Sequence, residues 1–282
     1  MRRLLTLACE GSQLGASLDG AEGRTGVLIV TGGSQTRIGS HRMFERLARS
    51  LAQNGYSCLR FDRRGVGDSD GEDPDFRANG PDIAAAAAAL REHCAQIERT
   101  IGFGLCDGAT SLGLFGASAG LAGLIMVNPW LVEAEAGAPA PAAIRHHYRQ
   151  RLMSIEGWKR LFGGSVSYDK LLKGLLKIAR PQPPSSLASE VGDALARASL
   201  PVELILARHD STAVAAAHVW NSTDFARHFG TFERHVTQLE TDSHTFARPG
   251  DPEALAPQFD QQRIAVRGEA ERRLVVIQSV SA

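Results

Sequence analysis

Cys106 stands in a segment whose residue types can support covalent catalysis, Gly104-Leu-Cys-Asp-Gly108. The pattern predicts a strand before it, from Ile101 to Leu105, and a helix after it, over about 107–118. A nucleophile exposed on a sharp strand-to-helix turn needs small flanking residues, because the two elements approach closely there. The segment therefore predicts a nucleophile elbow that carries a thiol in place of the more common hydroxyl.

An acid and a histidine are expected later in the chain, because the elbow architecture fixes the order nucleophile, acid, histidine. Asp210 follows an apolar strand predicted over Val202 to Ala207, and His244 follows a strand that ends near Leu239. His244 would accept the thiol proton and later return a proton to the leaving group. Asp210 would hold the imidazole tautomer and stabilise its cation.

Three other aspartates are alternatives to Asp210 as the acid: Asp82, Asp107 and Asp242. Asp82 stands where a helix is predicted to start, and Asp242 is too close in sequence to His244 for the usual triad geometry. Asp210 remains the preferred acid.

Stabilisation of an oxyanion needs two N–H donors near the nucleophile. The backbone amide of Asp107 would lie at a helix N-terminus, where the helix dipole also favours a thiolate. The second donor should come from the turn Thr31-Gly-Gly-Ser34, which follows a predicted buried strand, Val27 to Val30. Gly33 is the candidate, and Ser34 is the next one and a candidate substrate contact.

A competing motif is Gly116-Ala-Ser-Ala-Gly120, which matches the serine elbow pattern with Ser118 at its centre. It follows a predicted helix and precedes a predicted strand, Leu121 to Val127, which is the reverse of the order that an elbow requires. Ser118 is therefore the alternative nucleophile and Cys106 the preferred one.

The elements that must position these residues alternate along the chain. A hairpin is predicted over residues 3–18, followed by strands and helices in turn, which predicts a mostly parallel sheet covered on both faces. The alternation stops between 132 and 198, where we expect an inserted helical cap; residues 1–131 and 199–282 would form the core. Tyr148 and Trp158 of the cap are candidate substrate contacts.

Composition narrows the classes of partner. The chain has 282 residues, with 31 basic and 31 acidic side chains, so no charge excess points to nucleic acid. The four cysteines form no metal-binding or disulfide pattern, and Cys9, Cys58 and Cys94 are expected to be small buried hydrophobes. No apolar run is long enough to span a bilayer. We expect a cytoplasmic protein with no metal, no cofactor and a small-molecule substrate.

Several ordered segments resemble the α/β-hydrolase superfamily over nearly the whole chain, and a closer similarity is to the exosortase A system-associated hydrolases of bacteria. The segments are Thr31-Gly-Gly-Ser34, Arg60-Phe-Asp-Arg-Arg-Gly-Val-Gly-Asp-Ser69, Leu105-Cys-Asp-Gly108, Val127-Asn-Pro-Trp130 and His147-Tyr-Arg-Gln-Arg-Leu152. The resemblance implies an α/β-hydrolase fold, a structural role for the loop that contains Arg64 to Ser69, and substrates linked to exopolysaccharide or lipid-carrier metabolism.

Together these residues predict a hydrolase or acyltransferase that acts on an ester or thioester through a Cys106 thioester. A thiolate paired with histidine is a strong nucleophile, and its thioester can pass to water or to another acceptor such as a sugar hydroxyl. Two alternatives stay open at this point. One is a non-catalytic binding or assembly protein that keeps the fold, and the other is a serine esterase that uses Ser118.

Overall fold

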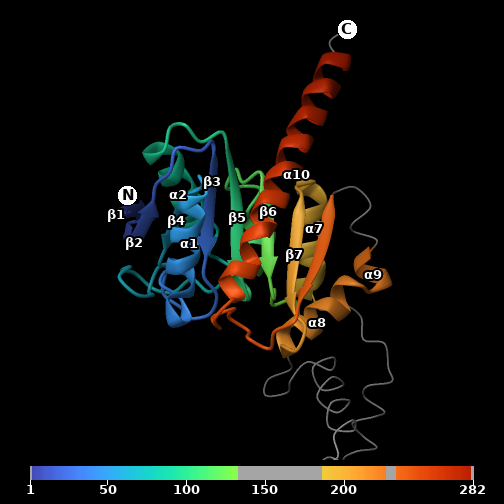
Figure 1. The fold of residues 1–282 in the computed structure, drawn as a ribbon, viewed down its shortest axis with the longest axis horizontal. Helices are drawn as coiled ribbons and strands as arrows, with labels where there is room; N and C mark the ends of the chain where they lie inside the picture. Colours follow the sequence, from blue (N-terminus) through green and yellow to red (C-terminus); the bar gives the residue numbers. More distant parts are fainter. Residues whose placement is uncertain (1, 133–185, 227–232, 281–282) are drawn as a thin grey trace, which may run out of the picture.

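The computed structural model describes residues 2–132, 186–226 and 233–280. These form an eight-stranded sheet in the order β1-β2-β4-β3-β5-β6-β7-β8, with helices on both faces (Figure 1). From β4 to β8 the strands are parallel, and the antiparallel hairpin of β1 and β2 completes one edge. The predicted mostly parallel sheet is confirmed.

The strands follow the apolar runs of the sequence. Their bounds are β1 Arg2–Cys9, β2 Ser12–Asp19, β3 Thr25–Val30, β4 Ser57–Phe61, β5 Arg99–Leu105, β6 Gly123–Val127, β7 Val202–Ala207 and β8 Arg234–Leu239. All five residues of β4 and of β6, and all six of β7, are buried. Continuous burial is expected of parallel strands that are covered on both faces.

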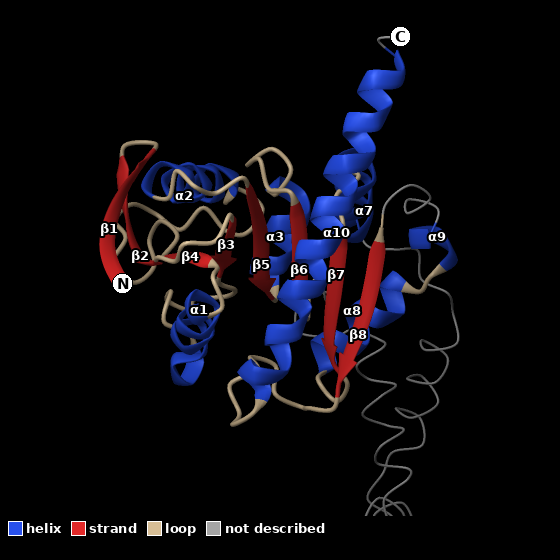
Figure 2. Ribbon diagram, turned by 45° about the horizontal axis from the view of Figure 1, so that its top comes forward, coloured by secondary structure: helices blue, strands red, loops and turns tan. Residues whose placement is uncertain are grey.

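The helices divide between the two faces of the sheet. Their bounds are η1 Ser40–Arg42, α1 Met43–Gln53, α2 Gly80–His93, α3 Asp107–Phe115, α7 Ser186–Ala198, α8 Ser211–Trp220, α9 Thr223–Ala226 and α10 Asp251–Val280. α1 and α10 pack together on one face, while α2, α3 and α7 pack on the other. Figure 2 shows α10 lying along the sheet and its C-terminal end extending past it. Among the described helices, none combines the length and apolar character that a bilayer span requires.

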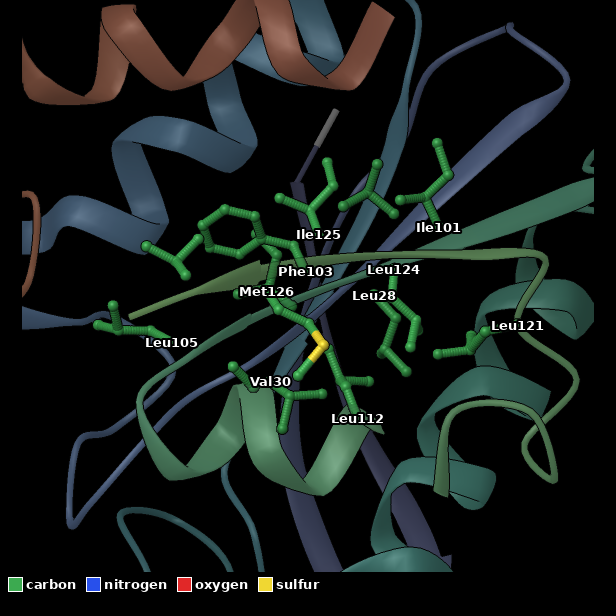
Figure 3. Packing of buried hydrophobic residues seen from close by; sticks show 14 of the residues in the cluster. Leu28, Val30, Ile101, Phe103, Leu105, Leu112, Leu121, Leu124, Ile125 and Met126 are labelled. Atoms are coloured by element: carbon green, nitrogen blue, oxygen red, sulfur yellow. The ribbon is translucent and has the colours of Figure 1, made fainter. Parts of the chain in front are cut away.

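The core beside the predicted nucleophile is built from β3, β5, β6 and α3 (Figure 3). Leu112 of α3 points toward Val30 and Met126 of the sheet, and all three side chains are fully or almost fully buried. Burying a side chain of this size stabilises a fold by about 1.5–3 kcal/mol. This packing holds α3 rigidly against the carboxyl end of β5, where Cys106 follows.

The predicted cap lies mainly outside the described residues, because 133–185 are not among them. Its last part forms α7, which packs against α3 through buried residues such as Val191. The extent of the cap, 132–198, therefore remains a prediction.

Candidate active site

Cys106 occupies the turn between β5 and α3 with φ 57° and ψ −124°. Such a backbone conformation is strained for any residue other than glycine, and strain of this kind concentrates at functional sites. Its flanking glycines are needed for close approach. A Cβ at Gly104 would lie 2.7 Å from Ala109 Cα, and one at Gly108 would lie 2.5 Å from the Thr31 carbonyl oxygen. The local structure is thus a strand, a strained turn and a helix, as the sequence predicts.

Asp210 and His244 meet at the carboxyl ends of the parallel strands. Asp210 is the N-cap of α8, and its Oδ2 accepts from the N–H of Ala213 at 2.8 Å. The same oxygen accepts from Nδ1 of His244 at 3.1 Å. The cap fixes the carboxylate at the end of β7, so the helix start positions the imidazole.

The electrostatics of this pair suit proton transfer. Hydrogen bonds to Asp210 and then to Cys106 outweigh burial and raise the pKa of His244 to about 10. Burial raises the pKa of Asp210, but the hydrogen bonds from His244 and Ala213 lower it below its usual value. The ring therefore holds a proton at neutral pH, with a carboxylate on one side and the Cys106 sulfur on the other.

Asn128 anchors the loop that carries His244. The sequence predicted only that a strand ends at this residue. Its side chain is fully buried, and its Nδ2 donates to the carbonyl oxygen of His244 at 2.9 Å. The Oδ1 atom accepts from the N–H of Ala207 at 2.8 Å. A local signal exists only in the Asn-Pro pair, which typically marks a turn.

The two expected oxyanion donors are the backbone amides of Asp107, the residue after Cys106, and of Gly33, in the turn after β3. Asp107 is the first residue of α3, so its amide is at the helix N-terminus. The N–H of Gly33 is occupied, because it donates to Oδ1 of Asp107 at 2.5 Å. Ser34 is exposed in the same turn as Gly33. The oxyanion hole therefore remains a prediction, and the Asp107 carboxylate already accepts the N–H of one of its two expected donors, Gly33.

Comparison of the sequence with models of known protein families identifies the family of this chain. A model described as the alpha/beta hydrolase family matches residues 27–265. The chain belongs to the alpha/beta hydrolase family. No curated protein matches it in sequence.

Solved structures of several proteins share this fold. The esterase Pf2001 of Pyrococcus furiosus is 14% identical with a TM-score of 0.62, covering 93% of this chain and 89% of its own. The alpha/beta hydrolase GrgF of Penicillium sp. sh18 is 17% identical with a TM-score of 0.62, covering 95% and 99%. A proline iminopeptidase of Mycobacterium smegmatis is 15% identical with a TM-score of 0.56, covering 97% and 100%. These structures, each 17% identical or less, show a shared fold, while the family match supports hydrolase activity at the level of the superfamily.

A pocket of about 490 Å³ opens beside Cys106. Its described lining consists of Arg63, Asp73, Asp75, Phe76, Cys106, Asp107 and Trp130. The Arg63 side chain is 8% exposed and its Nη2 donates to Asp73 at 2.8 Å. No partner for its Nε and Nη1 exists within the described part of the chain. No pattern in the sequence predicted that Arg63, which directly precedes the loop at 64–69, lines this pocket.

The alternative nucleophile and the alternative acids lie elsewhere in the molecule. Ser118 precedes β6, so it lies at the amino ends of the parallel strands, and its exposed hydroxyl donates to the Phe115 carbonyl at 2.8 Å. Asp82 is buried at the start of α2 and accepts from Arg64, while Asp242 pairs with Arg248. Neither Ser118 nor these two aspartates contacts His244 through any bond in the described ranges. Tyr148 and Trp158 lie outside those ranges.

The other three cysteines are buried, as expected, and the structural role of the loop at 64–69 remains an expectation. Cys9, Cys58 and Cys94 are buried and free, whereas Cys106 is partly exposed. Just before the loop, Asp62 accepts from the N–H of Arg37 and of Asp68, which ties the loop to its neighbours. Within the described ranges no three ligand-type side chains cluster to hold a metal ion.

Proposed function

We propose that the protein hydrolyses or transfers an acyl group from an ester or thioester through a triad of Cys106, His244 and Asp210. The observation that carries the proposal is the strained backbone of Cys106 at the strand-to-helix turn, with a histidine hydrogen-bonded to the sulfur and to an aspartate. Backbone strain concentrates at functional sites, and a histidine paired with a partly exposed thiol favours its reactive thiolate form, so both features support a nucleophilic role.

The proposed reaction proceeds in two stages. The Cys106 sulfur attacks the carbonyl carbon, and the electrons of the carbonyl double bond move to its oxygen, which the Asp107 and Gly33 amides would stabilise. When the intermediate collapses, the bond to the leaving group breaks and the His244 proton goes to that group. Water or a hydroxyl acceptor then loses a proton to His244 and attacks the thioester, which frees the thiolate.

The resemblance to the exosortase-associated hydrolases adds a narrower proposal about context. We infer that the acyl acceptor or donor belongs to exopolysaccharide or lipid-carrier metabolism in the cytoplasm. The three buried thiols that remain free suit a reducing compartment. A cap over residues 132–198, with Tyr148 and Trp158, would contact the substrate together with Ser34.

Covalent capture tests the triad. The full chain is incubated with p-nitrophenyl acetate or with an acetyl thioester, digested, and searched by mass spectrometry for the acetylated peptide. We expect the label on Cys106, its loss in Cys106→Ala, and an unchanged yield in Ser118→Ala, which is the matched control. In His244→Gln the label should form slowly and persist longer. Label on Ser118 would overturn the proposal, and no label on either residue would favour a binding protein.

A further inference from the structure

We propose that the Asp107 side chain is a specificity-determining residue that closes the oxyanion hole until a substrate moves its carboxylate toward Arg63. The proposal rests on the proposed function, because it concerns the same thiol and the same acyl transfer. It concerns the side chain of Asp107, whereas the proposed mechanism uses only the backbone amide of this residue.

One hydrogen bond and the tight space around Gly32 define the position of the carboxylate. Oδ1 of Asp107 accepts the Gly33 N–H at 2.5 Å. A Cβ built on Gly32 would lie 2.6 Å from the same oxygen and 3.0 Å from Cβ of Cys106. The carboxylate oxygen therefore lies in the narrow gap between the turn after β3 and the nucleophile, where the substrate oxygen must enter.

Occupation of this gap opposes acyl transfer in two ways. The Gly33 N–H already has an acceptor, so it cannot donate to a developing oxyanion until that bond breaks. A carboxylate beside an oxyanion also places two negative charges together in a partly buried site. Loss of one oxyanion donor typically slows catalysis by about 10²- to 10³-fold. A substrate that cannot displace Asp107 should react slowly.

Arg63 can receive the displaced carboxylate. It lines the same pocket as Asp107 and is the one guanidinium or ammonium group in the described lining. Its side chain is more than nine-tenths buried, and its Nε and Nη1 have no acceptor among the residues described. Buried guanidinium N–H groups normally have partners, and a carboxylate is the strongest one available.

The two other carboxylates in the pocket, Asp73 and Asp75, do not satisfy the remaining N–H groups of Arg63. Asp73 already accepts from Nη2 of Arg63, and its Oδ1 accepts from the N–H of Asp75 at 3.0 Å. Asp75 is exposed and accepts from the N–H of Arg77. Arg63 thus retains donor capacity beyond its pair with Asp73. A substrate that fills the pocket would move Asp107 and open the hole, which is selection by induced fit.

The first test compares acylation with alkylation at the same sulfur. Single-turnover acetylation of Cys106 by p-nitrophenyl acetate forms an oxyanion, whereas alkylation by iodoacetamide does not. We expect Asp107→Ala to raise the ratio of the acetylation rate constant to the alkylation rate constant by about tenfold or more. Asp107→Asn should raise it less, because its amide oxygen can still accept from Gly33. An unchanged or lower ratio in Asp107→Ala would overturn the proposal.

The second test is a double-mutant cycle with Arg63→Met, with thermal unfolding used to confirm that each variant is folded. We expect Arg63→Met to lower the ratio of the acetylation rate constant to the alkylation rate constant when Asp107 is present. In the Asp107→Ala background, Arg63→Met should leave this ratio unchanged. Equal losses in both backgrounds would mean that Arg63 serves the substrate directly, which overturns the proposal. If iodoacetamide alkylates Cys106 but no variant is acylated, the proposed function itself fails and this inference fails with it.

Discussion

The side-chain amide of Asn128 donates to the backbone carbonyl of His244, with 2.9 Å between Nδ2 and the oxygen. The same side chain accepts from the last residue of β7, Ala207, at 2.8 Å. One buried amide therefore joins the end of the strand that leads to Asp210 to the loop that carries the histidine. This link therefore constrains the distance between Asp210 and His244.

Replacement of Asn128 by Ala should impair both stability and acylation. The change leaves the Ala207 N–H and the His244 carbonyl without their partner, which costs about 1–3 kcal/mol of unfolding free energy. Acylation should slow because the histidine loop loses its anchor. Urea unfolding and single-turnover acetylation measure the two effects. Asn54→Ala, which removes an exposed hydrogen bond at the end of α1, should change neither, and a matching loss there would contradict the argument.

Replacement of Asp210 by Asn separates capping from charge. Asparagine is as good an N-cap as aspartate, so α8 should keep its start and the stability loss should be small. The charge that raises the pKa of His244 is removed, so that pKa should fall. Acylation should drop by about 10²- to 10⁴-fold. Asp242→Asn is the control, because this exposed aspartate pairs with Arg248; equal losses in both variants would exclude Asp210 as the acid.

The stability of the protein should depend on pH through His244. Its pKa is 6.5 in the reference state and about 10 in the fold. The native protein therefore binds the proton more tightly, and this contribution is fully present below pH 6.5 and is lost as the pH rises through about 10. Unfolding free energies of the wild type and of His244→Gln, measured across this range, should converge as the pH rises. A constant difference would contradict the pairing.

Replacement of Gly108 by Ala should disrupt the elbow. The new Cβ would lie 2.5 Å from the Thr31 carbonyl oxygen, and the backbone would have to move, at a cost of about 1–3 kcal/mol. Gly113→Ala in the same helix is the control. Its Cβ would meet only side-chain atoms of Val191 and Met126, at 3.0 and 3.2 Å, and alanine favours the helix. Chemical denaturation of the two variants should rank Gly108→Ala as clearly less stable.

Local patterns in the sequence were sufficient to place the main chemical groups. An apolar strand before Cys106 and small residues around it predict the elbow, and the strand order predicts where Asp210 and His244 follow. The same reasoning separated Cys106 from Ser118, whose motif has the right letters but stands between a helix and a strand in the wrong order. These signals are local because strands, turns and helix starts depend on neighbouring residues.

Only the tertiary structure decided which groups meet. Gly33 and Asp107 are 74 residues apart, and Asn128 and His244 are 116 apart, yet each pair is hydrogen-bonded. The local sequence around Arg63 likewise does not predict that its side chain is buried beside the pocket. Contacts of this kind depend on the order of the strands and on the packing of α3 against them, which no short pattern encodes. The sequence by itself placed Cys106, Asp210 and His244 after the ends of strands; the fold decided that Asp210 and His244 are hydrogen-bonded and that the Asp107 carboxylate accepts the Gly33 N–H.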